Sequence, residues 1–163
     1  MNSISRDQAE AAWDYLASLT DEETVEGLID TMAEEQPEAM AYLMSMGEDD
    51  FNEDEQELLL FLGIWMWKLL TDTGILAKEM TEKTLDGVQS KNLPLLEDLT
   101  ENYPGDFDRL VNLAVKDHAQ PEVIRVMAEI IEEEDEEVIR IKNRSDVLVY
   151  LRILLDGFLK TGA

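Results

Sequence analysis

Residues 53–73, EDEQELLLFLGIWMWKLLTDT, decide the fold, because they predict a helix that is apolar on every side. Trp65 and Trp67 point about 200° apart on a helix of about 3.6 residues per turn, so a helix on the surface would expose one of the two indoles. We therefore expect this helix to lie at the centre of the protein, with the other helices around it. The alternative is a homo-oligomer or partner interface through residues 53–73, since Trp is enriched as an interface anchor.

Helical periodicity runs through nearly all of the remaining chain. Apolar stripes at helical spacing cover 9–17 and 25–33, and Thr20 with Glu23 predicts a capping box at the start of the second helix. Asn52 is the predicted N-cap of the central helix. Further helices are predicted over residues 37–47, 75–90, 94–102, 106–118 and 121–134, and a last one begins at Ser145. The sequence therefore predicts a single all-α domain of about eight helices over residues 1–163.

The two halves of the chain resemble each other. The segment QPE at 36–38 recurs at 120–122, a shift of 84 residues, and the same shift places Asp72 on Asp156. Half of this shift falls within the roughly 40 to 47 residues of HEAT or armadillo helix pairs. We therefore expect an internal repeat, arranged either as a compact bundle or as a HEAT-like helical repeat. The two related halves are residues 1–84 and 85–163.

The chain is strongly acidic, and its charge is unevenly distributed. It has 38 Asp and Glu against 13 Lys and Arg, a net charge of -25, with -17 on residues 1–84 and -8 on residues 85–163. This charge repels phosphate backbones and anionic lipids, so we expect no direct binding to nucleic acid or membrane and favour a basic partner. The longest apolar run, Leu58 to Trp67, is about half of the roughly 20 residues that a membrane span needs. Residues 1–10 lack a secretory signal pattern, so a cytoplasmic location is expected.

No motif points to a particular chemistry. The chain has no Cys, which excludes disulfides and thiol chemistry. Its one His, His118, is expected at a helix end, where it interacts with terminal carbonyls. Asp50, Asn52 and Asp54 match the first three ligand positions of a calcium loop, but Glu55 stands where that loop needs Gly. We therefore predict no cofactor.

Residues 132–137 form an acidic run near the predicted C-terminus of a helix, where the negative end of the helix dipole makes carboxylates unfavourable. Arg140, Lys142 and Arg144 follow, so we expect a local turn that folds these basic side chains back on the acidic ones. The alternatives are a solvated, frayed helix end and a binding site for a partner or a cation.

The sequence favours a non-catalytic interaction module that binds a basic protein or basic helix through an acidic surface patch. The expected contact residues are Glu48, Asp49, Asp50, Glu53, Asp54 and Glu55, with Trp65 or Trp67 as an anchor if either is exposed. One alternative is a DNA mimic, whose surface carboxylates would imitate phosphates and occupy a nucleic-acid-binding protein. Another is a carboxylate-based, metal-dependent enzyme, which would need several acids on core-facing positions.

Overall fold

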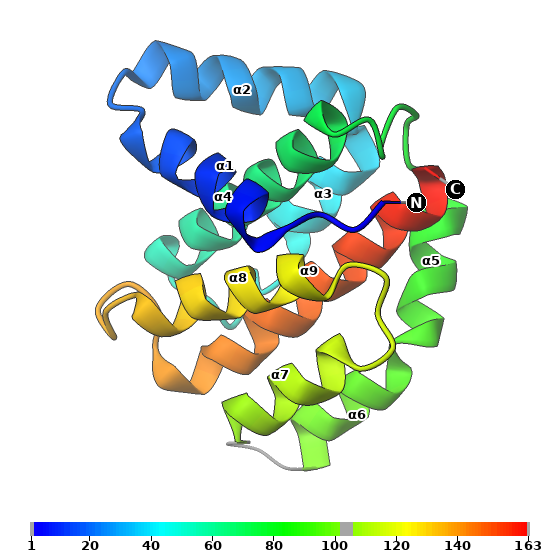
Figure 1. Cartoon of the computed structure of the whole chain (residues 1–163). Coiled ribbons are helices and arrows are strands. Elements are labelled where there is room, and N and C mark those ends of the chain that lie inside the picture. The colour runs from blue at the N-terminus through cyan, green and yellow to red at the C-terminus, as the bar shows by residue number, and fades with distance from the viewer. Residues whose placement is uncertain (1, 102–105, 163) are drawn as a thin grey trace.

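A computed structural model describes residues 2–101 and 106–162, and every regular element in these ranges is a helix (Figure 1). The nine helices of the described ranges are α1 (Arg6–Ser18), α2 (Glu22–Glu35), α3 (Pro37–Ser45), α4 (Glu53–Asp72), α5 (Glu82–Lys91), α6 (Leu93–Glu101), α7 (Phe107–Val115), α8 (Pro121–Glu133) and α9 (Ile141–Gly162). The predicted all-α fold of about eight helices is confirmed, with one helix more. Residue 102, the predicted end of one helix, lies outside the described residues.

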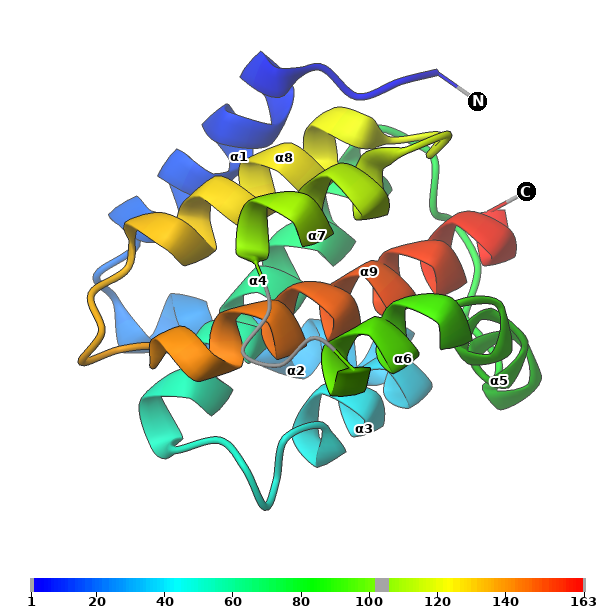
Figure 2. The same cartoon turned by 90° about the horizontal axis from the view of Figure 1, so that it is seen from below.

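The two longest helices, α4 and α9, contact each other at the centre of the bundle (Figures 1 and 2). α4 also packs on α1, α2 and α3, whereas α9 also packs on α5, α6, α7 and α8. Apolar residues from both helices belong to one continuous core. The central position expected for the helix over 53–73 is therefore confirmed. Within the described ranges, none of the helices has the length and apolar character needed to cross a membrane.

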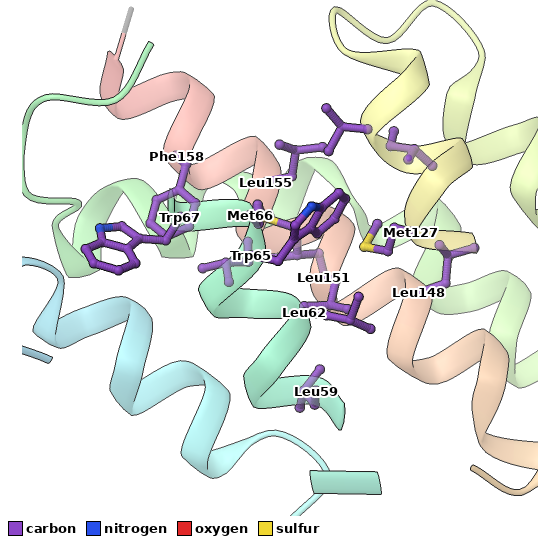
Figure 3. Packing of buried hydrophobic residues seen from close by; sticks show 14 of the residues in the cluster. Leu59, Leu62, Trp65, Met66, Trp67, Met127, Leu148, Leu151, Leu155 and Phe158 are labelled. Carbon is purple, nitrogen blue, oxygen red and sulfur yellow. The ribbon is translucent and has the colours of Figure 1, made fainter. Parts of the chain in front are cut away.

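Trp65 and Trp67 are both buried, with 0% and 5% of their surface exposed. Figure 3 shows Trp65 on the side of α4 that faces Met127, and Trp67 on the opposite side, near Phe158. Both indoles can be buried at once because α4 packs on α1, α2, α3 and α9. Neither tryptophan is therefore accessible as an anchor for an interface through this helix.

Capping side chains fix the points at which several helices begin, α4 and α2 among them. Asn52 Oδ1 accepts a hydrogen bond of 2.9 Å from the backbone N–H of Glu55, and the Glu55 carboxylate accepts from Asn52 N in return. The predicted N-cap of the central helix is thus confirmed as half of a capping box. The cap predicted at Thr20 is wrong, because Asp21 accepts from the backbone N–H of Glu23. A carboxylate at that position also suits the positive end of the helix dipole.

Residues 75–81 are not helical, so the helix predicted over 75–90 begins only as α5. Thr81 is the N-cap of α5, since its Oγ1 accepts from the N–H of Thr84 at 3.2 Å. The segment ahead of it is bonded by Gln36, a buried residue between α2 and α3. Its side-chain amide donates to the carbonyl of Lys78 at 2.7 Å and accepts from the N–H of Met80 at 2.8 Å. These bonds satisfy backbone groups that would otherwise need partners within a helix, and they hold the segment against α3.

α9 begins at Ile141, four residues before the start predicted at Ser145. The residue before it, Arg140, is held by α4, since its backbone N–H donates to the carboxylate of Glu55 at 3.0 Å. The backbone N–H of Asn143 then bonds to the carbonyl of Arg140 at 2.9 Å. A contact with a distant helix therefore sets this boundary, and local periodicity does not reveal it.

Candidate functional site

A hollow of about 360 Å³ opens between α1, α2, α4 and the segment that joins α8 to α9. We call it the apolar chamber, because most of its lining side chains are hydrocarbon. Its apolar lining includes Trp13, Leu16, Leu19, Leu58, Phe61 and Val138. Three carboxylates, from Asp54, Glu57 and Glu134, also line it. The chamber can therefore receive an apolar group that is flanked by positive charge.

A second hollow of about 460 Å³ lies between α1 and α8, and we call it the acidic chamber. Six carboxylates line it, from Glu10, Asp14, Glu129, Glu133, Glu134 and Asp135. Among the described residues, Arg6 is its one cationic lining residue. Trp13 and Glu134 line both chambers, so the two adjoin. We refer to the pair as the Trp13 groove.

Trp13 is held in place from behind. Its indole ring stands edge-on to that of Trp65, with ring centroids 6.4 Å apart and an interplanar angle of 90°. Trp65 is itself fixed, because its Nε1–H donates a buried hydrogen bond of 3.0 Å to the carbonyl of Ala9. The half-buried Trp13 therefore presents a rigid apolar wall to the groove, and little side-chain entropy would be lost when a ligand packs on it.

Arg6 connects α1 to α8 inside the acidic chamber. Its Nε lies 2.8 Å from Glu10 Oε1, and its Nη2 donates a hydrogen bond to Glu129. All three side chains are more than two fifths exposed. The carboxylates of Asp14, Glu133 and Asp135 lack an ion pair within the described part of the chain, and the acidic chamber therefore keeps a strong excess of negative charge.

The expectation that basic side chains fold back on the acidic run 132–137 is wrong for Arg140, which bonds to α4. Arg144 does turn back, but its Nη2 donates to the backbone carbonyl of Glu134 at 3.2 Å. That contact satisfies the backbone just beyond the end of α8 and leaves the carboxylates of Glu133 and Asp135 facing the groove.

The acidic residues predicted for a surface patch separate into exposed and buried members. Glu48, Asp49 and Asp50 are exposed in the loop between α3 and α4, and Glu53 and Asp54 are exposed in the first turn of α4. Of these five, Asp54 lines the apolar chamber. The structure does not bring the other four into either chamber.

Glu55 does not belong to an exposed patch, because its side chain is 0% exposed. Its carboxylate accepts from Arg140 Nη2 at 2.6 Å and from Asn143 Nδ2 at 2.9 Å. Burial raises the pKa of Glu55, but the bonds from Arg140, Asn52 and Asn143 outweigh it and lower the pKa to about 2. Its stabilising effect is therefore present above about pH 4.5 and is lost as the pH falls toward 2.

The condition set for a tryptophan anchor is not met by Trp65 or Trp67, since both are buried. The tryptophan that reaches the groove is Trp13, which the sequence indicates only as part of an apolar stripe. One signal does point to it: its stripe neighbours Ala12 and Ala17 are small and leave space beside the indole. Periodicity alone cannot show whether neighbouring helices fill that space.

His118 lies against α9 and does not contact helix-terminal carbonyls through its side chain as expected. Its Nδ1 accepts from the backbone N–H of Gln120 at 2.9 Å, and its Nε2 lies 2.7 Å from Asp156 Oδ1. Because Nδ1 is an acceptor, the proton sits on Nε2 and is donated to Asp156. Both ring nitrogens are thus used within the fold, which gives His118 a structural role and leaves no free lone pair for a general base.

The calcium-like pattern at 50–54 does not form a cation site, because the side chain of Asn52 caps α4. Within the described ranges, His, Cys, Asp and Glu side chains do not form a group of three that could hold a metal ion. The eight carboxylates of the Trp13 groove are instead distributed over two chambers. Such an arrangement suits an extended ligand with several positive charges.

Comparison of the chain with protein-family models, with curated proteins and with solved structures finds no match. The geometry and charge of the Trp13 groove are therefore the basis on which a function is proposed.

Proposed function

We propose that the chain is a non-catalytic interaction module that binds a basic, amphipathic segment of a partner protein in the Trp13 groove. The observation that carries this proposal is the joining of an apolar and an acidic chamber through Trp13 and Glu134. An apolar side chain of the segment enters the apolar chamber, while its basic side chains lie along the acidic chamber. Asp54 links the groove to the acidic patch predicted from the sequence.

Charge complementarity supports a basic partner. The groove has eight carboxylates and, among its described lining residues, one cation, in a protein whose net charge is -25. A field of this sign raises the association rate of positively charged segments and disfavours phosphate backbones and anionic lipid surfaces. In this proposal, Glu48, Asp49, Asp50 and Glu53 strengthen the field from outside the groove.

The apolar chamber supports a protein segment over a simple polycation. Transfer of one large apolar side chain from water into such a hollow is favourable by roughly 1.5–3 kcal/mol. This corresponds to about a tenfold to hundredfold gain in affinity. Residues that alternate between apolar and basic faces occur in amphipathic helices, a common class of groove ligand. A polyamine would leave the apolar chamber empty.

The two alternatives from the sequence account for fewer features of the groove. A DNA mimic needs carboxylates spaced like phosphates and has no use for the apolar chamber. A metal-dependent enzyme needs carboxylates that converge on one point, and those of the groove are spread over both chambers. We therefore rank the binding of a basic amphipathic segment first.

A pair of peptides with the same composition tests the proposal. One peptide is designed as a helix with a leucine-rich face and an arginine-rich face, and the other has the same residues in scrambled order. Binding is followed by tryptophan fluorescence and by calorimetry at low and moderate salt. We expect the amphipathic peptide to bind roughly tenfold more tightly than the scrambled one, because the scrambled peptide keeps only the electrostatic part. Equal affinities would overturn the proposal.

A variant pair on α1 separates the apolar chamber from the general charge. Ala17→Glu places a longer side chain at an exposed position in the apolar chamber, and Ala11→Glu makes the same change at an exposed position outside the groove. Both variants add one negative charge. If charge alone governed binding, both would bind the amphipathic peptide slightly more tightly. We expect Ala17→Glu to weaken binding by roughly tenfold and Ala11→Glu to leave it nearly unchanged.

A further inference from the structure

We propose that the loop between α3 and α4, residues 46–52, is a pH-sensitive strap that lies fixed on α9 while the carboxyl group of Asp146 is protonated and opens when that group ionises. We call this segment the α3–α4 loop. The inference does not depend on the proposed function, because residues 46–52 are not among the described lining residues of the Trp13 groove. The loop is thus fixed at acidic pH and opens more often at neutral pH.

Asp50 and Phe51 fasten the α3–α4 loop to Arg140 and to the first turns of α9. The backbone carbonyl of Asp50 accepts hydrogen bonds from Arg140 Nη2 at 2.9 Å and from Asn143 Nδ2 at 3.5 Å. The buried ring of Phe51 packs against that of Tyr150, with ring centroids 6.0 Å apart. A surface loop that is held in this way opens at a lower free energy than the core helices.

The turn inside the loop is packed against the ring of Phe51. Gly47 has a φ of +70°, a left-handed conformation that favours glycine. Its carbonyl accepts from the backbone N–H groups of Asp50 and Phe51 at 3.0 and 2.7 Å. A Cβ added at Gly47 would lie 2.3 Å from the Phe51 ring. The turn and the ring therefore move together, and the N–H of Phe51 reports whether the loop is closed.

Asp146 lies on the face of α9 that the loop covers. It follows Asn143 by three residues and precedes Tyr150 by four, so the three side chains share one face of the helix. Asn143 and Tyr150 are the α9 residues that contact the loop. The partly buried carboxyl group of Asp146 is therefore placed between the two fastening contacts, and it gains access to water when the loop opens.

Ionisation of Asp146 opposes the closed loop. Burial, and then the negative charge of Asp50, raise the pKa of Asp146 from 3.8 to about 6. Both effects weaken when the loop opens, so the carboxyl then titrates nearer to its ordinary value. Stabilisation of the closed loop is therefore fully present below about pH 3.8 and is lost as the pH rises through about 6.

The groups that α3, α4 and α9 place around this carboxyl hold their charge near pH 6. Glu55 of α4 has a pKa of about 2, because the bonds described above outweigh its burial, and it stays ionised. Burial raises the pKa of Tyr42, whose hydroxyl donates to the carbonyl of Tyr150 at 2.6 Å. Burial and the charges of Asp146 and Asp50 raise the pKa of Tyr150. Both phenols therefore stay neutral, and Arg140 stays charged.

Hydrogen exchange at the Phe51 amide tests the proposal. Protection factors, which correct for the pH dependence of the chemical exchange rate, are measured at about pH 4 and about pH 7. We expect the protection of Phe51 in wild type to fall roughly tenfold over this range, because the raised pKa is partly screened by solvent. In Asp146→Asn, which has nearly the same shape and cannot ionise, a change of less than about twofold is expected.

Two further variants remove one negative charge each from the α3–α4 loop. Asp49→Asn changes an exposed residue and is the control, in which the roughly tenfold fall is expected to remain. Asp50→Asn removes the charge that opposes ionisation of Asp146 but leaves its burial, so we expect a smaller fall than in wild type. An unchanged fall in Asp50→Asn would overturn the proposal even if Asp146→Asn did not fold.

Low urea separates opening of the loop from unfolding of the whole protein. Exchange through a local opening is nearly insensitive to about 1 M urea, whereas exchange through global unfolding is accelerated. We expect exchange at Phe51 to be insensitive to urea at both pH values. Acceleration by urea at neutral pH would overturn the proposal. So would a protection factor that does not fall with pH in wild type, or one that falls equally in Asp146→Asn.

Discussion

The two central helices each contain a pair of opposite charges four residues apart, in very different surroundings. On α4, Lys68 Nζ lies 3.2 Å from Asp72 Oδ2, and on α9, 84 residues further along, Arg152 Nη1 lies 3.6 Å from Asp156 Oδ2. The Asp72 side chain is 62% exposed, whereas that of Asp156 is 19% exposed. The same local pattern is thus a surface ion pair in one half and part of a buried network in the other.

The network around Asp156 joins four elements of the second half. His118 Nε2 and Asn92 Nδ2 donate to the two carboxylate oxygens at 2.7 and 2.9 Å. Arg152 also donates to the carbonyl of Ala114 and to Asn92 Oδ1. Burial raises the pKa of Asp156, but the bonds from His118 and Asn92 and the charge of Arg152 outweigh it, so the pKa lies below its usual value.

The largest predicted effect is that of a substitution that breaks this network. We expect Asp156→Ala to lower the free energy of unfolding by about 3 kcal/mol, because it leaves donors of His118, Asn92 and Arg152 buried without their acceptor. Asp72→Ala, at the corresponding position of α4, is expected to cost less than about 0.5 kcal/mol. Urea unfolding of the two variants measures both values, and equal losses would contradict the comparison.

A second comparison concerns the two Gln-Pro steps that suggest the repeat. Gln36 and Gln120 have nearly the same backbone angles, φ -134° and ψ 64° against φ -127° and ψ 64°. Both side chains are buried, and each holds a segment just before a helix, α5 for Gln36 and α1 for Gln120. Gln36 bonds to Lys78 and Met80 ahead of α5. Gln120 bonds in the same way to the carbonyl of Asn2 and the N–H of Ile4, ahead of α1.

These matching bonds support the proposal that residues 1–84 and 85–163 are related halves. We expect Gln36→Ala and Gln120→Ala each to cost about 2 kcal/mol, since a buried backbone donor and acceptor lose their partner. Gln89→Ala is the control, with an expected change within about 0.5 kcal/mol.

Amide hydrogen exchange sharpens this prediction. In Gln36→Ala, the N–H of Met80 is expected to lose protection while that of Ile4 keeps it, and in Gln120→Ala the reverse is expected. Loss of protection at both amides in either variant would mean that the hydrogen bonds of Gln36 and those of Gln120 do not act independently.

The sequence predicts the elements that depend on neighbours within one helix. The central place of α4 follows from its apolar residues on every side, and its N-terminus follows from Asn52. The errors at residues 75–81, at the start of α9 and at His118 have one physical cause. Each position is bonded to a partner more than 35 residues away, namely Gln36, Glu55 and Asp156, although Thr81 also caps α5 locally. Helical periodicity contains no information about such partners.

The candidate site is predictable in its charge and not in its shape. The acidic character and Asp54 are evident in the sequence, and the acidic run 132–137 supplies three further groove carboxylates. The apolar chamber is not evident, because it arises where α1, α2 and α4 leave space around Trp13. Glu55 is indistinguishable from its acidic neighbours in the sequence, and only its bonds to Arg140 show that it is structural.

A third comparison sets Asp146 on α9 against Leu62, the residue 84 positions earlier on α4. Leu62 is 0% exposed in the core, whereas Asp146 places a partly buried carboxyl group on the other central helix. Burial, and then the negative charge of Asp50, raise the pKa of Asp146 from 3.8 to about 6. The second half thus has an ionisable group where the first has a hydrocarbon side chain.

The smallest predicted effect follows from this raised pKa. In the unfolded chain Asp146 ionises near pH 3.8, so the stability associated with its neutral form is fully present below that pH and is lost as the pH rises through about 6. Asp146→Asn removes this loss. As the pH rises from 4 to 7, we expect the free energy of unfolding of the variant to increase by roughly 1–2 kcal/mol relative to that of wild type. This is less than the full pKa difference would give, because solvent reaches part of the group. Urea unfolding at both pH values measures the gain, and an unchanged difference between variant and wild type would show that ionisation of Asp146 is not opposed by the fold.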